Sequence, residues 1–298
     1  MSDSCLQMPA EMPWFSILGV NVSAIDLPTA TQTILAWVAD RRSGYVTITG
    51  VHGVMEARDS PEFRRVLRGA RMVTPDGMPL VYYGRVRRHQ VSRVYGPDLM
   101  LALMEATRDG TIRHYFYGGG EGVADRLRDR LSRRFPGIAV AGTMTPPFRP
   151  LSEHEEEETA AAINASRADI VWIGLSTPKQ EYWMARMCDR LDAPILIGVG
   201  AAFDFNAGLK SQAPRILQIL ALEWLYRLAT EPRRLWRRYL RNNPRFLLLI
   251  AGEFLLGRRY FQLQDKDMDD DSPPTSGRGQ QPSAVAARSL PSGPPAGR

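Results

Sequence analysis

The chain has 298 residues, of which 44% are hydrophobic and 23% are charged. These values are ordinary for a globular protein and exclude a collagen-like or wholly disordered chain, and the length suits one or two domains. Cysteine occurs only at Cys5 and Cys188, which excludes a disulfide framework or a cysteine zinc site and favours a reducing compartment. The net charge is +6, and only three of the 38 basic residues are lysine, which leaves 35 arginines suited to bidentate phosphate contacts.

We expect neither a targeting segment nor a membrane span. The N-terminus lacks the basic start and apolar stretch of a signal peptide. The most apolar run, Phe246–Gly257, has about half the length that crosses a bilayer, and it contains Glu253. The composition from Asp265 onward, rich in Pro, Ser, Gly and Asp, predicts disorder. We therefore expect a cytoplasmic protein with an N-terminal extension (1–16), a core (17–224), an appendage (225–264) and a disordered tail (265–298).

Strand and helix patterns alternate through the body of the chain. Buried strands are predicted at Tyr45–Thr49, Arg71–Thr74, His114–Tyr117, Ile138–Ala141, Asp169–Leu175 and Pro194–Val199, and helices at Pro61–Ala70 and Gly122–Phe135. This alternation predicts an α/β fold with a mostly parallel sheet and helices on both faces. Ligand sites in such sheets lie at the carboxyl ends of strands. Four polar or glycine-rich segments fall there: Thr49–His52, Pro75–Gly77, Gly118–Gly122 and Thr177–Glu181.

Three glycines, Gly118, Gly119 and Gly120, follow the third predicted strand and precede a helix. Free backbone N–H groups at a helix N-terminus form an anion site. The spacing does not match the G-x-G-x-x-G fingerprint, because Val123 or Glu121 stands where glycine is required, depending on the register. The segment therefore favours a nucleotide diphosphate over NAD, with a tight turn that binds no ligand as the alternative.

Asp76 and Gly77 lie in VTPDGMPL, directly after the second predicted strand. Pro-Asp-Gly by itself indicates only a turn. Its position at the rim of the sheet changes the interpretation, because a carboxylate there can act as a general base. Such a base contributes roughly 10²–10⁴-fold to a rate.

The segment Pro178–Glu181 follows the strand that ends near Leu175. Lys179 offers a point charge for a phosphate, and Gln180 offers an amide for a sugar or a base edge. The alternative is a helix start with a solvated lysine. For the glycine-rich segment Gly198–Gly208, structural and ligand-binding interpretations carry equal weight.

The histidines and acidic residues give no metal-ligand spacing. His52 follows a strand end and is a candidate site residue, whereas His89, His114 and His154 are expected to be structural or exposed. The D-x-D matches after residue 264 lie in a charged, low-complexity stretch, which indicates solvated charge. We therefore predict no metal and no cofactor.

The segment LATEPRRLWRRYLRNNPRFLLLI predicts a basic amphipathic helix. Thr230 is placed as its N-cap and Asn242-Asn243-Pro244 as its end. At about 100° per residue, Leu235, Trp236, Tyr239 and Leu240 form an apolar face. The opposite face is formed by Arg233, Arg234, Arg237, Arg238 and Arg241.

Between residues 225 and 260, nine arginines stand against Glu231 and Glu253, a local charge of +7. A basic helix with Trp and Tyr at its polar–apolar boundary suits an anionic membrane surface. The alternative is a basic helix packed on its own domain. No nucleic-acid motif accompanies the strip, so nucleic acid is not an expected partner.

Six stretches carry a family resemblance: VTPDGMPL, SRVYGPDLM, YFYGGGEGVA, STPKQEYWM, GVGAAFDFNAG and LEWLYRLATEPRRLWRRYL. They occur in family order between about residues 17 and 247, and the chain resembles the WecG/TagA/CpsF glycosyltransferases, which build bacterial surface polysaccharides. The resemblance implies a Rossmann-like fold with a C-terminal appendage that completes the site and touches the membrane. It also implies oligomers in which the appendage reaches a neighbouring subunit.

The implied activity is sugar transfer from a UDP-sugar to a glycan on a polyprenyl diphosphate, with inversion and without metal, at the inner face of the plasma membrane. The family's base corresponds to Asp76. The substrate-binding candidates are Thr49, His52, Gly77, Arg93, Gly118, Gly119, Gly120, Lys179, Gln180, Glu181, Arg227, Arg234 and Arg237. In this hypothesis the donor diphosphate lies over Gly118–Gly120, and arginines supply the counter-charge for the leaving UDP.

One position departs from the family pattern. Many members carry Thr-x-Asn after the first long strand, whereas here Gly50 stands where Asn is usual, and Thr49 or His52 would take over its contact. Two rival hypotheses stay open. A nucleotide-sugar oxidoreductase is disfavoured by the unmatched fingerprint, and a non-catalytic membrane adaptor is disfavoured by Asp76, Arg93 and Gln180 on one rim.

Overall fold

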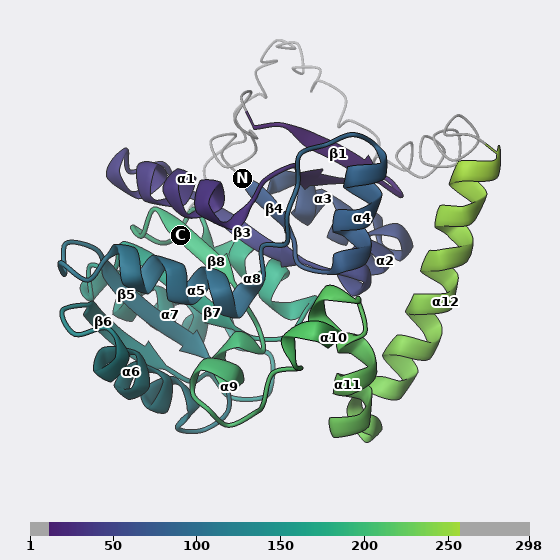
Figure 1. Cartoon of the computed structure of the whole chain (residues 1–298). Helices are drawn as coiled ribbons and strands as arrows, with labels where there is room; N and C mark the ends of the chain where they lie inside the picture. Colours follow the sequence, from purple (N-terminus) through teal and green to yellow (C-terminus); the bar gives the residue numbers. More distant parts are fainter. Residues whose placement is uncertain (1–11, 257–298) are drawn as a thin grey trace, which may run out of the picture.

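The computed structural model describes residues 12–256 and contains a central six-stranded sheet (Figure 1). The strands are β3 (Gly44–Thr49), β4 (Met72–Pro75), β5 (Arg113–Gly118), β6 (Ala139–Met144), β7 (Ile170–Gly174) and β8 (Ile195–Gly198). Their spatial order is β4-β3-β8-β7-β5-β6, and every neighbouring pair is parallel. All six strands coincide with predicted ones to within a few residues, so the α/β prediction is confirmed.

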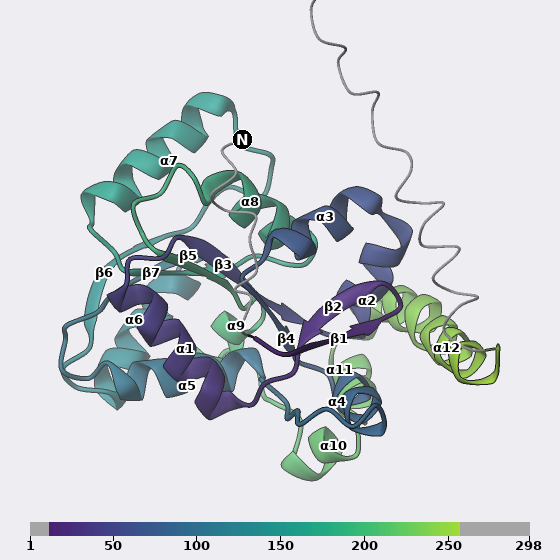
Figure 2. The same cartoon turned by 90° about the horizontal axis from the view of Figure 1, so that it is seen from above.

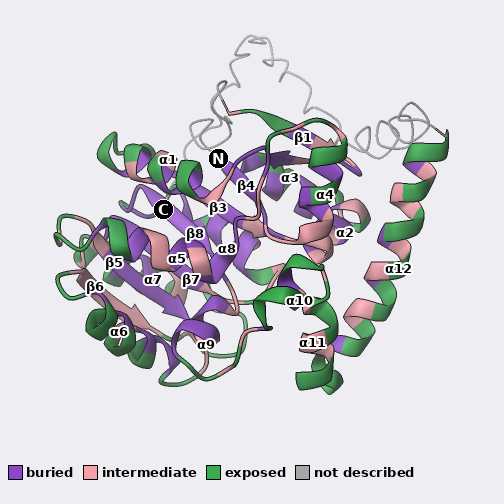
Figure 3. Ribbon diagram, in the orientation of Figure 1, coloured by how far each residue is buried: buried purple, intermediate pink, exposed green. Residues whose placement is uncertain are grey.

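Helices cover both faces of the sheet (Figure 2). One face carries α2 (Val51–Asp59), α3 (Pro61–Gly69), α7 (Glu153–Ala165) and α8 (Lys179–Met187), and the other carries α1 (Leu27–Ala39), α5 (Gly96–Ala106), α6 (Val123–Arg134) and α9 (Ala202–Asn206). Alternate strand residues serve the two cores: Val171 and Ile173 of β7 pack on the first face, and Ile170 and Trp172 on the second. The inner strands β7 and β8 are therefore buried almost along their length, whereas the edge strand β6 is half-buried (Figure 3).

Short sequence signals start several of these helices. Ser60 precedes α3, and its hydroxyl accepts from the Phe63 N–H at 3.1 Å. Ser152 and Glu155 form a reciprocal capping box at the start of α7. Such caps satisfy N–H groups that have no partner within the helix.

An antiparallel hairpin of β1 (Trp14–Ile17) and β2 (Val20–Ser23) was not predicted. Its turn places both Leu18 and Gly19 at positive φ, 50° and 81°, which matches the twist of a hairpin but is unusual for leucine. The hairpin covers the outer edge of β4, where the Val73 N–H donates to the Ser23 hydroxyl at 3.2 Å. It thereby protects an edge strand that would otherwise expose unpaired backbone groups.

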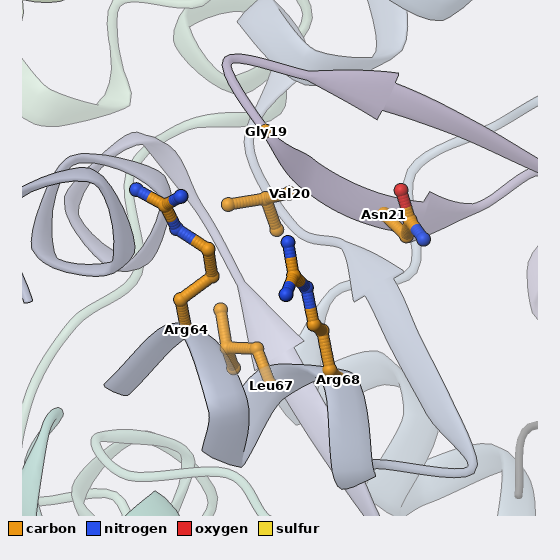
Figure 4. A pocket seen from close by; sticks show the side chains of 6 residues that line it. All are labelled: Gly19, Val20, Asn21, Arg64, Leu67 and Arg68. Carbon is orange, nitrogen blue, oxygen red and sulfur yellow. The ribbon is translucent and has the colours of Figure 1, made fainter. Parts of the chain in front are cut away.

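A cavity of about 250 Å³ lies between the hairpin turn and α3, and Arg64 and Arg68 extend from α3 toward it (Figure 4). Arg64 is almost fully buried, and its Nε donates to the Ala57 carbonyl at 3.1 Å. This contact joins α3 to the end of α2, so Arg64 has a clear structural role.

The chain leaves neighbouring strands β3 and β8 toward opposite faces of the sheet. After β3 it enters α2 on the first face, and after β8 it enters α9 on the second. Divergent loops at adjacent parallel strands open a crevice at their carboxyl ends, where open α/β sheets bind ligands. Asp76 follows β4 beside this crevice, and Thr177–Glu181 follow β7 on its other side.

The C-terminal part of the described chain forms α10 (Arg215–Ile219), α11 (Glu223–Thr230) and α12 (Pro232–Leu256). The predicted helix end at Asn242-Asn243-Pro244 is wrong, because α12 continues through Pro244. The proline removes one helical donor, but Leu235 before it and Phe246 after it are both buried against the body. Thr230 does not cap α12 either: its hydroxyl donates to the Tyr226 and Arg227 carbonyls at 3.2 Å, within α11.

The face of α12 that packs on the body also differs from the prediction. Leu235, Asn242, Phe246 and Glu253 are buried, at spacings of 7, 11 and 18 residues from Leu235 that match whole turns of a helix. The helix exposes apolar side chains on its outer surface: Trp236, Leu240, Leu247, Leu248, Phe254 and Leu255. Within residues 12–256, no helix combines the length and apolarity that a bilayer span requires. The predicted disordered tail lies outside the described residues.

Candidate active site

The backbone at the end of β4 holds Asp76 in place. The Asp76 N–H donates to the Thr49 carbonyl at 2.9 Å, and the Arg93 Nε donates to the Asp76 carbonyl. Gly77 then precedes α4 (Met78–Val86). Gly50 leaves space beside the carboxylate, since a Cβ built there would lie 3.8 Å from Asp76 Oδ2.

Arg93 connects Asp76 to the C-terminal segment. One guanidinium nitrogen, Nη2, lies 2.6 Å from Glu223 Oε2 and 3.4 Å from Asp76 Oδ1, and Nη1 lies 3.2 Å from Gln218 Oε1. The guanidinium also stacks over the Tyr95 ring, 4.0 Å from its centroid. Asp76 and Arg93, which we predict on the same rim, are thus in contact. Gln218 and Glu223 were missed, because only the folding of α10 and α11 over the rim brings them there.

The surroundings of Asp76 favour a stronger base than a free aspartate. Burial raises the pKa of the carboxyl, Arg93 opposes that shift, and the nearby Glu223 carboxylate adds to it. The side chain still keeps 29% of its surface exposed, so it remains accessible to a substrate. A carboxylate with a raised pKa that is open on one side suits proton abstraction.

On the other side of the crevice, α8 begins with two buried polar residues, Gln180 and Glu181. Gln180 Nε2 and the Thr177 hydroxyl donate to Glu181 Oε1 at 3.0 and 2.9 Å. The remaining oxygens, Gln180 Oε1 and Glu181 Oε2, are buried without a hydrogen-bond partner in the described part of the chain. Burial raises the pKa of Glu181. Unpartnered buried oxygens point to a ligand or water that donates to them, whereas Lys179 is exposed on the surface of α8.

His52 links α2 to α12. Its Nδ1 lies 3.0 Å from Asn242 Nδ2, and burial together with the positive charge of Arg238 lowers the pKa of His52 to about 4. The imidazole is therefore neutral near pH 7. The sequence predicts His52 as a site residue, but it does not predict the contact of His52 with α12.

Two arginines from the C-terminal helices face the crevice. Arg227 of α11 lies over the Phe205 ring, 5.6 Å from its centroid, and its charge acts on Asp76. Arg238 of α12 acts on His52 and Glu181, and burial lowers its pKa to about 10. In both side chains the Nε is buried and lacks a hydrogen-bond partner among residues 12–256. These groups suit an anionic ligand, which would satisfy them.

Of the three C-terminal arginines predicted to bind substrate, only Arg227 lies in this cluster. Arg234 is half exposed and pairs with Glu231 at 2.7 Å, and Arg237 extends over the neighbouring Trp236 ring. Arg238 was assigned to the outer face of the helix and instead points inward. A helical wheel orders the side chains around an axis, but it does not show which sector packs on the body.

Thr49 is buried, and its hydroxyl lies 3.2 Å from that of Thr47. Its carbonyl holds the Asp76 backbone, so Thr49 positions the loop. Gly50 itself has an ordinary φ of −108°. The absence of a side chain at Gly50 therefore leaves room beside Asp76 and relieves no backbone strain.

Backbone conformation and close packing explain why glycine occurs at the first two positions of the triplet Gly118–Gly120. Gly118 and Gly119 adopt positive φ, and a Cβ at Gly118 would lie 2.8 Å from the Gly174 carbonyl carbon. The Gly119 N–H already donates to the Gly174 carbonyl at 3.0 Å. The triplet follows β5, four strand positions from β4, which corresponds to roughly 19 Å at about 4.8 Å per strand. The predicted contact of a donor diphosphate with Gly118–Gly120 stays a prediction.

The remaining histidines have local partners. His114 is fully buried between the Thr107 hydroxyl at 2.9 Å and Trp172 Nε1 at 3.1 Å, which supports the structural interpretation. His154 is exposed beside Glu158. In the described ranges, no three His, Cys, Asp or Glu side chains are grouped as metal ligands.

Ion pairs hold α12 against the body of the same chain. Asp59 of α2 pairs with Arg245 at 2.7 Å. Near the other end, the Tyr83 hydroxyl of α4 and Arg87, which directly follows α4, donate to Glu253 at 2.5 and 3.0 Å. Glu253, the acidic residue in the most apolar stretch, is buried. These contacts fix the helix that carries Arg238 and Asn242.

Comparisons with known proteins identify the family of this chain. The family model described as glycosyl transferase WecG/TagA/CpsF matches residues 15–260. A relative from Bacillus spizizenii named N-acetylglucosaminyldiphosphoundecaprenol N-acetyl-beta-D-mannosaminyltransferase is 31% identical over 230 residues, which cover 76% of this chain and 87% of the relative. The chain therefore belongs to the WecG/TagA/CpsF family of glycosyltransferases.

Proposed function

We propose that this glycosyltransferase moves a sugar from a UDP-sugar to a sugar carried on a polyprenyl diphosphate, with inversion and without a metal. The relative's name supports N-acetylmannosamine as the transferred sugar and N-acetylglucosaminyl diphosphoundecaprenol as the acceptor. One observation carries the proposal: the Asp76 carboxylate at the rim faces a crevice that holds the buried, unpartnered Nε groups of Arg227 and Arg238.

In the proposed reaction, an acceptor hydroxyl attacks the anomeric carbon of the donor. Asp76 takes the proton of that hydroxyl, the new glycosidic bond forms, and the bond to the UDP oxygen breaks. A single displacement from an α-linked donor gives the β-linked product that the relative's name specifies. Arg93 keeps the Asp76 carboxylate oriented through the 3.4 Å contact.

The leaving UDP gains negative charge as the bond breaks, and fixed positive charge stabilises it. Arg227 and Arg238 supply that charge in this proposal, so the donor diphosphate lies between Asp76 and α11–α12. This arrangement is an alternative to the predicted position of the diphosphate over Gly118–Gly120. Two arginines there do the electrostatic work that a divalent ion does in other transferases.

We further propose that the protein binds peripherally to the inner face of the plasma membrane through α12. The exposed Trp236 and Leu240 lie beside the exposed Arg237 and Arg241 on its first half, and leucines are exposed on its second half. An apolar surface next to arginines suits the boundary of an anionic bilayer. A polyprenyl-linked acceptor would be reached from that position.

A donor screen tests this function. The full chain is incubated in excess EDTA with detergent-solubilised N-acetylglucosaminyl diphosphoundecaprenol and single UDP-sugars, and UDP release and the product anomer are measured. We expect acceptor-dependent UDP release with one N-acetylated donor and a β-linked product. Release that requires added Mg²⁺ or Mn²⁺ would refute the metal-free mechanism, and hydride transfer to NAD would favour the oxidoreductase hypothesis.

A further inference from the structure

A row of arginines lies on α6, on the side of the sheet away from β4. Arg126, Arg130 and Arg133 are spaced by four and three residues, so they share one face of the helix. Together with Ala207 they line a cavity of about 460 Å³ between α6 and the turn after α9. Figure 1 shows α6 and α9 as neighbours.

The turn after α9 holds two of these guanidinium groups. Arg126 Nε donates to the Ala207 carbonyl at 3.0 Å. Arg130 occupies the space beside Gly208, where an added Cβ would lie 2.0 Å from Arg130 Nη1. Gly208 also adopts φ +70°, a conformation that disfavours any side chain. The turn after α9 therefore holds the Arg126 and Arg130 guanidinium groups in place before any ligand arrives.

Within residues 12–256, no carboxylate neutralises the row, because none of Arg126, Arg130 and Arg133 forms an ion pair with one. The acids of the same helix point elsewhere: Asp125 and Asp129 pair with Arg128 at 3.0 and 2.9 Å. Like charges four residues apart destabilise a helix, so a bound anion would relieve a real repulsion.

We propose that the row Arg126–Arg130–Arg133 is a binding site for phosphate groups, separate from the site at Asp76. Three guanidinium groups around one concave space match the oxygens of a phosphodiester or a diphosphate, which accept paired N–H donors. The anion is either the phosphodiester of an anionic lipid or a soluble phosphate. The site does not depend on the proposed transferase mechanism, because none of its residues contacts the Asp76 cluster.

The first test titrates the full chain with pyrophosphate and follows the arginine Nε–Hε signals by NMR. The signals of Arg126, Arg130 and Arg128 are assigned from the variants Arg126→Gln, Arg130→Gln and Arg128→Gln. We expect the Arg126 signal to shift on titration and Arg130→Gln to weaken that response about tenfold. Arg128→Gln is the matched control on the same helix, and it should change the affinity less than twofold. Equal effects of Arg128→Gln and Arg130→Gln, or no response at Arg126, would overturn the site.

A second arm separates the two sources of phosphate. The same variants are sedimented with vesicles of pure phosphatidylcholine and with vesicles containing phosphatidylglycerol. If Arg130→Gln lowers binding to the phosphatidylglycerol vesicles and Arg128→Gln does not, the ligand is the lipid phosphodiester. If only the pyrophosphate response changes, the site takes a soluble phosphate. Neither arm measures sugar transfer, so failure of the proposed function would leave the result intact.

Discussion

Asp76 and Glu223 are acidic residues joined by one arginine, Arg93, at 3.4 and 2.6 Å. Asp76 is partly exposed and has a pKa raised by burial and by Glu223. Arg93 thus shares its charge between a carboxylate that is open to the substrate and one that closes the rim. The arrangement keeps Asp76 oriented without making it a weak base.

The pH dependence follows from these shifts. A base acts when deprotonated, so kcat/KM should fall as the pH falls through the raised pKa of Asp76. Because Glu223 raises that pKa, Glu223→Gln should move the acid limb to lower pH. The pKa of His52 is about 4, so His52→Gln should leave the limb in place between pH 5 and 8. The pH dependence of kcat/KM in the wild type, Glu223→Gln and His52→Gln checks this prediction. A shift of the acid limb in His52→Gln would contradict the assignment of that limb to Asp76.

Arg238 and its neighbour Arg237 make a matched pair for testing the inward arginine. Arg238→Gln should weaken binding of the UDP-sugar at least about tenfold, because a charge-assisted contact to the diphosphate is lost. Arg237→Gln, which changes an arginine directed at the Trp236 ring, should alter donor binding less than about twofold. Calorimetric titration of both variants checks this. Equal losses would show that only the overall charge of the helix matters.

Helix α12 is held against the body near both of its ends. Glu253, near its C-terminal end, accepts from Tyr83 of α4 and from Arg87, which directly follows α4. Because α4 begins just after Asp76 and α12 carries Arg238, this contact connects two elements that supply the site. The buried Glu253 carboxylate and its two donors therefore position α12 against the body of the same chain.

Glu253→Ala should loosen this helix. Removing the Glu253 carboxylate leaves the Tyr83 hydroxyl and the partly exposed Arg87 guanidinium without this acceptor, which costs about 1–3 kcal/mol. We expect faster amide hydrogen exchange over α12 and a higher KM for the donor, with smaller changes for Glu253→Gln, which retains an acceptor for Tyr83. Glu105→Ala, which removes an exposed ion pair with Arg108, is the control. Unchanged amide hydrogen exchange over α12 in Glu253→Ala would contradict the role of Glu253 in positioning this helix.

Much of the fold could be predicted from the sequence, because buried parallel strands and capped helices leave local patterns. The hairpin was missed because its turn uses Leu18 at positive φ, where a glycine or asparagine would have signalled it. The continuation of α12 was missed because Pro244 normally ends a helix, and only contacts remote in sequence outweigh it. At the site, Asp76 and Gln180 follow from strand ends and Arg93 from the family resemblance, whereas Glu223 and Arg238 depend on how the C-terminal helices fold back.

At the scale of the whole molecule, the outer side of α12 and the row on α6 are two surfaces that carry exposed arginines. The crevice at the ends of β3 and β8 lies between them along the sheet. In the proposed function, this separation lets α12 lie at the membrane while the rim binds the nucleotide-sugar. Domain borders at 17, 225 and 265 remain predictions.

Charge reversal on α12 tests the membrane contact. Arg237→Glu combined with Arg241→Glu should release the protein from phosphatidylglycerol-containing vesicles, since each arginine near an anionic surface contributes about 1 kcal/mol. High salt should weaken wild-type binding in the same sedimentation assay. Arg237 and Arg241 are chosen because both are exposed, whereas Arg238 faces the crevice. Wild-type sedimentation of the double variant would show that another surface binds the membrane.

The most direct test of the central claim compares sugar transfer and donor binding in the wild type and in Asp76→Asn. Asparagine keeps the shape of the side chain and removes the base, so transfer to the lipid acceptor should fall at least about a hundredfold. The UDP-sugar should still bind with an affinity within about threefold of the wild type, and the melting temperature near pH 7 should not decrease, because a carboxylate with a raised pKa is unfavourable in the fold. Transfer at the wild-type rate by Asp76→Asn would contradict the assignment of Asp76 as the base.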